Sequence, residues 1–355
     1  MALCGRTPEP SQALAQRLGV SAVRFDWRSA LDEFRPDIVA ITTPAGPHRD
    51  MAVAAAEAGC HVACEKPLGV NAAEAREMLA AGERKGVKHA YAATGCYAPF
   101  FGYVRSLLSE GVIGMVREID YMVHDFNLPP LVPRFWVHQL ESGGGFLNNF
   151  FTHLLQQVLM LTGGTVTAAM GTVTRHIDRA PIGRPVHDFR EGFGAMLTPE
   201  QAATADWGAI DIDLGFALML QLRLPAGQMV LARFTKPEDT HYPYPSYFAL
   251  HGSAGTLYLS QTSSQWTIQR FDVTQGAWTD VVVPPTAVLA PDEDQVQHHW
   301  NQFFQEFVAD VRGEGYGGYP TFHDGWVAAE VMDIARSGRG WIPVPEHGGD
   351  QPRQT

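Results

Sequence analysis

The nine residues His61-Val62-Ala63-Cys64-Glu65-Lys66-Pro67-Leu68-Gly69 decide the fold. Residues 61–64 predict a short apolar strand that ends on a carboxylate, an ammonium and a proline in immediate succession. Parallel strands in α/β sheets are otherwise apolar, so a charged pair at the end of one is costly to bury. That edge is also where open α/β sheets bind ligands. We therefore expect chemistry from Glu65 and Lys66, although a Glu-Lys pair alone is more typical of a surface ion pair.

The chain around this stretch alternates strands and helices. The β-branched run over residues 37–41 predicts a strand buried on both faces. Two helices separate it from the strands expected over 61–64 and 88–93: an alanine-rich one over 48–59, and one running from a capping-box-like Asn71-Ala72-Ala73-Glu74 to about residue 86. Helices of this length between strands imply right-handed crossovers and a parallel sheet. The sequence thus predicts half of a doubly wound, Rossmann-like nucleotide-binding fold.

The opening of the chain departs from that fold. A dinucleotide-binding domain normally begins with a strand, a Gly-rich turn and a helix that holds the pyrophosphate. Here a strand over residues 1–4 is followed by Gly5-Arg6-Thr7 and a helix over about 10–19, with no G-x-G-x-x-G. In the usual strand order this opening matches the second strand, so the first βα unit is expected to be missing and two central strand edges unpaired. We expect either an upstream start by about one βα unit, or a protein that has lost the phosphate cradle and its redox function.

The pattern of the sequence changes at about residue 115. Alternating apolar and polar segments, punctuated by Gly and Pro, predict a mostly antiparallel open sheet with strands over 116–123, 165–174, 216–224, 228–234, 247–251 and 256–260. Residues 294–313 and 322–337 are expected to be helical, and 176–213 to be a long insertion. We therefore divide the chain into a nucleotide-binding domain (1–114), an α/β substrate and oligomerisation domain (115–345) and a disordered tail (346–355).

Composition narrows the class of protein. The 355 residues suit two domains that share an interface, and 45% hydrophobic residues allow large cores. A net charge of −12 argues against nucleic acid or an anionic membrane as partner. The four cysteines show no paired spacing, so neither disulfides nor a metal site is expected, and a cytoplasmic location fits. No apolar run reaches the length of a membrane span.

Several motifs together resemble the glucose–fructose oxidoreductase / inositol dehydrogenase (Gfo/Idh/MocA) family. They are Thr43-Pro44-Ala45-Gly46-Pro47-His48, Glu65-Lys66-Pro67-Leu68, the Gly143-Gly144-Gly145 run with His153, the turn over 251–256 and the closing Ala335-Arg336-Ser337-Gly338-Arg339. The resemblance implies a pyridine-nucleotide dehydrogenase acting on a sugar, a cyclitol or a related polyol. It also implies a homodimer or homotetramer paired through the open sheet face.

The resemblance assigns roles to individual residues. Lys66 is implied to lie beside the nicotinamide and the reacting hydroxyl, where an ammonium can relay a proton and stabilise alkoxide charge. Glu65 is implied to orient Lys66 or contact the nicotinamide ribose, and the Lys66–Pro67 peptide to be cis. Thr43, Pro44 and His48 are implied to line the nicotinamide half of the cofactor site.

Two departures from the family pattern follow the glycine run. Asn149 stands where the family has an aspartate, and Phe151 where it has a glycine. An amide can hydrogen-bond a hydroxyl, but it cannot take a proton or favour a protonated partner. Catalysis is then expected to depend on Lys66 and His153, with Asn149 as a hydrogen-bonding residue. The alternative for His153 is a buried histidine with its hydrogen bonds satisfied.

The remaining assignments are weaker. Gly5 and Arg6 follow the first strand, where a cation in place of a carboxylate favours NADP over NAD, or simply marks a surface arginine that begins a helix. Tyr97 and Trp136 are candidates for substrate contact, Trp136 by stacking on a sugar, with core packing as the alternative.

Three functions remain open from the sequence. The leading one is an NAD(P)-dependent oxidoreductase of small hydroxylated substrates. A non-catalytic sugar or nucleotide sensor is favoured by the missing Gly-rich turn and by Asn149, and opposed by the intact Glu65-Lys66-Pro67. An enzyme that holds its cofactor tightly and oxidises its substrate only transiently is the third.

Overall fold

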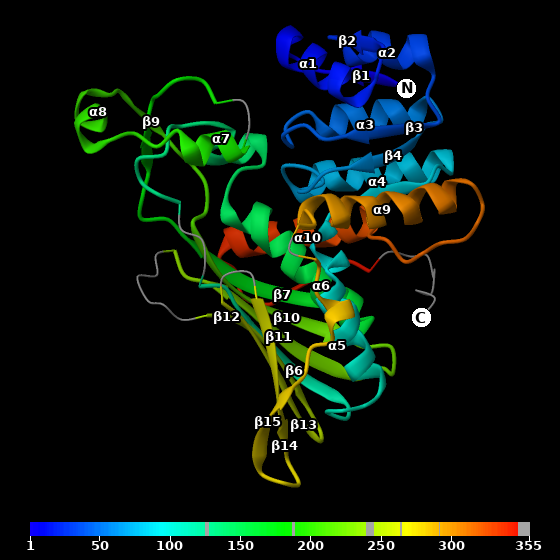
Figure 1. Ribbon diagram of the computed structural model, residues 1–355, viewed down its shortest axis with the longest axis vertical. Coiled ribbons are helices and arrows are strands. Elements are labelled where there is room, and N and C mark those ends of the chain that lie inside the picture. Colours follow the sequence, from blue (N-terminus) through cyan, green and yellow to red (C-terminus); the bar gives the residue numbers. More distant parts are fainter. Residues whose placement is uncertain (125–127, 187–188, 239–244, 263–264, 291, 347–355) are drawn as a thin grey trace.

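The computed structural model describes residues 1–346, except 125–127, 187–188, 239–244, 263–264 and 291. An α/β region built from the first part of the chain lies at the top of Figure 1, and a large sheet flanked by helices lies below it. The largest hydrophobic cluster of the described residues runs through both, from Ile41 and Val62 in the upper region to Phe248 and Leu259 in the large sheet. The two regions are therefore packed against each other.

The predicted alternation of strands and helices is present in the upper region. Strands β3 (Ile38–Ile41), β4 (His61–Cys64) and β5 (His89–Tyr91) pair in parallel in that order. Helices α3 (His48–Glu57) and α4 (Ala72–Lys85) connect them. The side chain of Asn71 caps α4 by accepting the Glu74 N–H at 2.9 Å, as its sequence suggests.

The opening of the chain forms a separate small sheet. Strands β1 (Ala2–Cys4) and β2 (Ala22–Arg24) pair in parallel and are joined by α1 (Pro8–Leu18), with α2 (Trp27–Phe34) following β2. Within the described residues β1 pairs only with β2, and β3 only with β4. The parallel strands thus form two sheets with unpaired facing edges, as expected from the unusual opening.

One prediction for this region is wrong. The strand over 37–41 was expected to be buried on both faces, but in β3 only Ile41 is buried, Ile38 and Val39 are half-buried and Ala40 is exposed. The reason is its position. A β-branched run predicts burial only for a strand covered on every side, and β3 is the edge strand of its three-stranded sheet.

The second region is built on a nine-stranded sheet in the order β15-β14-β13-β12-β6-β11-β10-β7-β16. Only the β6–β11 pair is parallel, which confirms the mostly antiparallel prediction. The strands are β6 (Val116–Met122), β7 (Thr165–Thr174), β10 (Gly215–Arg223), β11 (Met229–Lys236), β12 (Ser246–Gly252), β13 (Gly255–Thr262), β14 (Gln265–Asp272), β15 (Ala277–Val281) and β16 (Ile342–Pro343).

Helices cover one face of this sheet. Buried and exposed residues alternate along β10, where Phe216, Leu218, Leu220 and Leu222 all point into the core. Residues of α5 (Pro99–Ser109), α6 (Thr152–Thr162) and α10 (Phe322–Ser337) belong to the same core. Figure 1 shows α5 and α6 running along this side of the sheet. The other face carries charged and apolar side chains together, among them Arg233, Met219 and Leu231.

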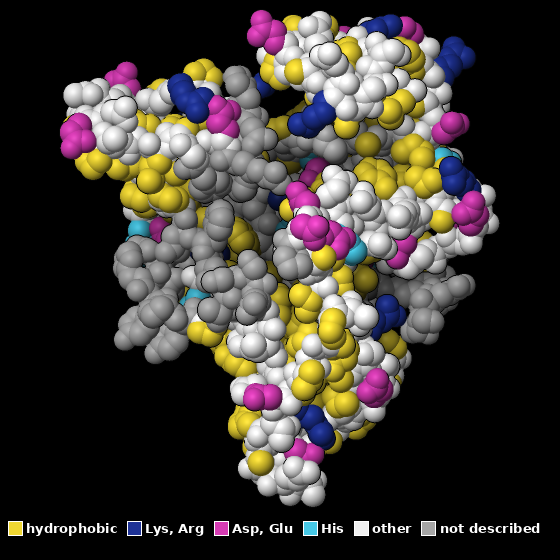
Figure 2. All heavy atoms as spheres, viewed as in Figure 1, with side chains coloured by type: hydrophobic (Ala, Val, Ile, Leu, Met, Phe, Trp, Pro, Cys, Tyr) yellow, Lys and Arg dark blue, Asp and Glu magenta, His cyan; other side chains and the backbone are white. Residues whose placement is uncertain are grey.

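A further helix and an inserted arm lie beside the two regions. Helix α9 (Gln295–Val311) packs Phe303 and Phe307 against Ala63, Ala90 and Ala92 of the small parallel sheet. The predicted insertion forms an arm with β8 (Arg179–Pro181), α7 (Phe189–Gly194), α8 (Pro199–Thr204) and β9 (Trp207–Ala209), at the upper left of Figure 1. Figure 2 shows hydrophobic side chains gathered on this arm. Among the helices of the described residues, none is long and apolar enough for a membrane span.

Candidate active site

Two segments from different regions meet at the candidate site. The turn after β4 carries Glu65, Lys66 and Pro67, and the Lys66–Pro67 peptide is cis, as the resemblance implies. The glycine run lies directly against this turn. A Cβ built on Gly143 would stand 2.5 Å from Cβ of Ala45 and 3.2 Å from Cγ of Pro67. Because Gly143 also has a φ of +79°, only glycine fits at this contact.

Lys66 crosses from the first region to the second. Its Nζ donates to Oδ1 of Asn149 at 2.8 Å. Nδ2 of Asn149 donates to the carbonyl oxygens of Gly145 at 2.7 Å and Gly143 at 3.4 Å. The Lys66 side chain is only half-buried, yet the surrounding protein lowers its pKa by desolvation, and the negative charge of Glu65 opposes this only in part. Such a lysine loses its proton more easily than an exposed one.

Glu65 supports the turn. Its carboxylate accepts the backbone N–H of Lys66 at 2.7 Å. Burial raises the pKa of Glu65, while the positive charge of Lys66 and this hydrogen bond oppose the rise. Within the described residues the lysine ammonium is hydrogen-bonded to Asn149 and forms no ion pair with Glu65. The simple surface ion pair that the sequence also allowed is therefore not present.

His153 is the second residue of α6 and lies one turn after Asn149. Its Nδ1 lies 3.3 Å from the backbone N–H of Gly95 and accepts it. Burial, followed by the positive charges of Lys66 and His299, lowers the pKa of His153 to about 3. The ring is thus neutral at pH 7. We assign its proton to Nε2, because Nδ1 is used as an acceptor. His153 can then donate a hydrogen bond to a ligand oxygen.

His48 lies behind the site. It is fully buried, with Nε2 2.8 Å from the Thr43 carbonyl oxygen and Nδ1 3.1 Å from that of Pro67. Desolvation is the main reason why its pKa is lowered. Both ring nitrogens face backbone carbonyl oxygens, and the nitrogen that carries the proton donates to its neighbour, so His48 lies between the residues after β3 and the Glu65–Pro67 turn. Pro44 is exposed beside it.

Thr43 provides a test of whether a dinucleotide fits. Its Oγ1 is buried and has no hydrogen-bond partner among the described residues. Buried hydroxyls are normally paired, so an unpaired one points to a polar ligand group. It follows β3, next to the turn after β4, at the edge where open α/β sheets bind ligands. This edge therefore fits a ligand, such as a dinucleotide, that offers a polar group to Thr43.

Four other predicted site residues make their contacts elsewhere in the molecule. The Gly5 N–H donates to the Arg24 carbonyl in the β1–β2 sheet, and Arg6 next to it is exposed. The Tyr97 hydroxyl donates to Glu306 of α9 at 2.7 Å. Trp136 is half-buried and packs edge-on against Phe135. Among the described residues, none of these four has a hydrogen bond or ring contact that links it to Lys66.

Sequence reasoning missed a buried ion pair that supports the site. Arg336 of α10 donates to Asp213 Oδ1 at 2.9 Å and to Asn148 Oδ1 at 2.9 Å. The second Asp213 oxygen accepts the Leu147 N–H at 2.6 Å. This pair therefore fixes the start of the π-helical turn Leu147–Phe151, which carries Asn149. The available signal was a carboxylate between two apolar residues, Ile212 and Leu214.

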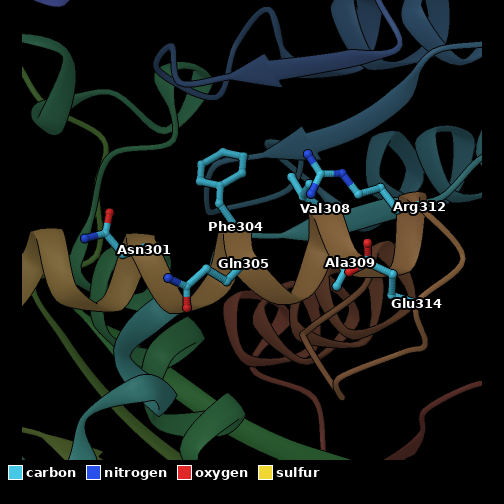
Figure 3. Close-up of a pocket in the computed structure, with 7 residues that line it drawn as sticks. All are labelled: Asn301, Phe304, Gln305, Val308, Ala309, Arg312 and Glu314. Atoms are coloured by element: carbon cyan, nitrogen blue, oxygen red, sulfur yellow. The ribbon is translucent and has the colours of Figure 1, made fainter.

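A separate hollow lies on α9. It has a volume of about 410 Å³ and is lined by Asn301, Phe304, Gln305, Val308, Ala309, Arg312 and Glu314 (Figure 3). None of the residues that meet at Lys66 lines it. In the described part of the chain, no group of three or more His, Cys, Asp or Glu side chains is arranged to hold a metal ion.

Comparisons with known proteins agree with this architecture. A family model described as "Oxidoreductase family, NAD-binding Rossmann fold" matches residues 1–92, and one described as "GFO/IDH/MocA C-terminal domain" matches residues 101–258. The fold and the site define a two-domain oxidoreductase with a Rossmann-like dinucleotide-binding domain. The chain belongs to the Gfo/Idh/MocA oxidoreductase family, as its motifs indicate.

Individual relatives are dehydrogenases of sugars by name. The levoglucosan dehydrogenase of Pseudarthrobacter phenanthrenivorans is 25% identical, over 96% of this chain and 88% of the relative. The D-glucoside 3-dehydrogenase of Escherichia coli (strain K12) is 33% identical over 46% of each chain. The structure of levoglucosan dehydrogenase in complex with NADH and levoglucosan has a TM-score of 0.75 and 23% identity, covering 97% of this chain and 90% of that one. At this identity the structural match shows the fold.

Proposed function

We propose that this protein is an NAD(P)-dependent oxidoreductase that acts on a CH–OH group of a sugar, a cyclitol or a related polyol. The observation that carries the proposal is the Lys66–Asn149 hydrogen bond, which joins the end of a strand in the nucleotide-binding region to the glycine run of the second region. The names of the relatives, levoglucosan dehydrogenase and D-glucoside 3-dehydrogenase, support the class of substrate. The comparisons give no support to the alternative, a non-catalytic sensor.

In this proposal Lys66 and His153 both act on the substrate oxygen, Lys66 as the proton acceptor and His153 as a hydrogen-bond donor. When bound, the nicotinamide supplies the hydride acceptor. Lys66, as a neutral amine, takes the hydroxyl proton while the carbon loses its hydride, and the alcohol becomes a carbonyl. His153 donates from Nε2 to the same oxygen and orients it, since its lowered pKa leaves the ring neutral. In the reverse direction the Lys66 ammonium returns the proton.

The cofactor is proposed to lie along the carboxyl ends of β3 and β4. Thr43 and Glu65 would hold the nicotinamide half, with Pro44 at the surface and His48 behind them as a support. Gly5 and Arg6 would face the adenosine ribose, where the exposed guanidinium of Arg6 favours the 2′-phosphate of NADP. Comparing the Kd values of NADP⁺ and NAD⁺ by titration calorimetry, in the native protein and in Arg6→Ala, tests this preference.

Domain roles follow from the same placement. Residues 1–114 would bind the dinucleotide and residues 115–345 the substrate, while nearly all of the predicted tail (346–355) lies outside the described residues. Trp136 is the candidate for stacking on a sugar ring. Tyr97 would contribute its ring, because its hydroxyl is already donated to Glu306.

We also propose a homodimer or homotetramer that pairs through the open face of the nine-stranded sheet. On this face Arg233 of β11 pairs with Glu118 and Asp120 of the neighbouring strand β6, a charge pattern that a second copy can complement. Sedimentation at micromolar concentration would show a species heavier than 38.9 kDa, and a monomer alone would contradict the proposal. A reducing, cytoplasmic location is proposed because all four cysteines are free.

The function is tested by offering NAD⁺ and NADP⁺ with a panel of anhydrosugars, aldoses, glucosides and inositols. We expect reduced nicotinamide to accumulate with at least one of them and the product to be the corresponding carbonyl compound. Binding of a sugar without turnover, with either cofactor and in either direction, would reject the enzyme and favour the sensor.

A further inference from the structure

The amide of Asn149 is held in one orientation. Its Nδ2 points at the carbonyl oxygens of Gly145 and Gly143, at 2.7 and 3.4 Å. Carbonyl oxygens accept only, so the nitrogen must lie on that side and the amide oxygen on the side of Lys66. The distance of 2.8 Å between Oδ1 and the lysine Nζ agrees with this assignment.

The two carbonyls cannot easily turn away. Gly143 is packed against Ala45 and Pro67, with no room for even a Cβ. Gly145 has a φ of +93°, and a Cβ built on it would stand 3.0 Å from the Asp213 carboxylate. A carboxylate at position 149 would place one of its oxygens near these carbonyl oxygens, where like partial charges repel. The pocket around residue 149 is therefore shaped for a neutral amide.

The charge around Lys66 depends on this neutrality. The titratable groups that face it are Glu65 on its own turn, His153 on α6 and His48 on α3. The pKa of His153 is lowered to about 3, so its ring is neutral at pH 7, and burial lowers the pKa of His48 as well. Glu65 is then the only anion among these groups, and its own pKa is raised. An amide oxygen accepts a hydrogen bond from an ammonium or from an amine, so Asn149 holds Lys66 in place and stabilises its charge less than a carboxylate would.

We propose that Asn149, locked by the carbonyls of Gly143 and Gly145, is a positioning residue that orients Lys66 while leaving it without a carboxylate partner at this contact, so that Lys66 loses its proton more readily than it would beside an aspartate and can serve as a base. The role as a base rests on the proposed function. The control of the lysine's protonation by Asn149 is a property of the protein alone and can be measured without substrate or cofactor.

The test introduces a carboxylate with Asn149→Asp. The rate at which acetic anhydride modifies Lys66 is followed against pH by mass spectrometry of its peptide, with exposed Lys85 as the internal reference. In the native protein we expect Lys66 to titrate at lower pH than Lys85. In the variant its midpoint should rise by about 1–3 pH units, the usual effect of an opposite charge within a few ångströms.

Asn148→Asp is the matched control. Asn148 donates its amide to Gly144 of the same glycine run at 2.7 Å, but its oxygen faces Arg336 instead of Lys66. We expect no movement of the Lys66 midpoint in this variant. An equal shift in both variants, or none in Asn149→Asp, would overturn the proposal. If Asn149→Asp does not fold, the labelling of the native protein still tests the proposal. Equal labelling midpoints for Lys66 and Lys85 in the native protein would contradict it.

Measuring kcat/KM against pH in the same variants separates this inference from the proposed function. If the function is right, the acid limb of kcat/KM moves to higher pH in Asn149→Asp, and activity at pH 7 falls by about 10–1000-fold. Activity at high pH should recover, which a merely damaged site would not show. Should no polyol be oxidised by the native protein, the proposed function fails, and the labelling experiment still tests the effect of Asn149 on Lys66.

Discussion

The two halves of the candidate site are built in opposite ways. The turn after β4 presents a half-buried lysine at the edge of a small sheet, with charges whose pKa values are shifted by burial. The segment that faces it, from Gly143 to His153, is uncharged, and a buried ion pair between Asp213 and Arg336 fixes it from behind. In the proposed mechanism one half thus carries the reactive group, and the other carries the structure that holds it. Mutations in the two halves should therefore have different signatures.

The largest effect is expected for the reactive half. Lys66→Met keeps the length of the side chain and removes the ammonium. Turnover should fall by a factor on the order of 10²–10⁴, because the proton acceptor is lost, with cofactor affinity little changed. The melting temperature should stay the same or rise, since a half-buried charge is removed. Steady-state kinetics and calorimetry measure both quantities. Full turnover in Lys66→Met would place the reactive group elsewhere.

The supporting half should respond with a loss of stability. Asp213→Asn leaves Arg336 without a carboxylate in a site where the Asp213 side chain is only 2% exposed. Breaking a buried pair costs about 3–5 kcal/mol in the free energy of unfolding, which denaturant titration can measure. The control is Glu57→Gln, which removes an exposed carboxylate bonded to Arg84 and Lys85 and should cost about 1 kcal/mol or less. Equal losses would mean that the buried pair does not anchor the segment.

Local patterns were enough to predict much of the fold. Helix α10 has the predicted bounds of 322–337 and β7 those of 165–174, because capping residues and apolar periodicity are properties of neighbouring residues. Strands β14 and β15 were not predicted, and β15 is nearly all exposed at the edge of the sheet, where alternation is weak. The exposure of β3 could not be predicted either, since it depends on which strands pair beside it.

The candidate site also has features that the sequence could predict and features that it could not. Lys66, Asn149 and His153 could be named as candidates because they lie in short motifs with recognisable spacing. Asp213 and Arg336 are separated by more than one hundred residues, and only the folded chain shows that they meet. The same holds for the hydrogen bond from Gly95 to His153, which determines the tautomer and hence separates a donor from a base. Residue identity could be predicted, but the direction of each hydrogen bond could not.

The smallest effect is expected at Gly95, which lies outside both halves and contacts the second one through its backbone. Gly95 donates its N–H to His153, and a Cβ built on it would stand 3.2 Å from both His153 Nδ1 and Gln157 Nε2. Gly95→Ala should displace the ring by a few tenths of an ångström, and kcat/KM should fall by up to about tenfold, less than in His153→Asn. The matched control is Gly102→Ala in α5, where a Cβ meets nothing within 4 Å. That variant should keep full activity and be slightly more stable, because alanine favours the helix. If Gly95→Ala is as active as Gly102→Ala, the position of His153 does not depend on this contact, and its hydrogen-bonding role must be assigned differently.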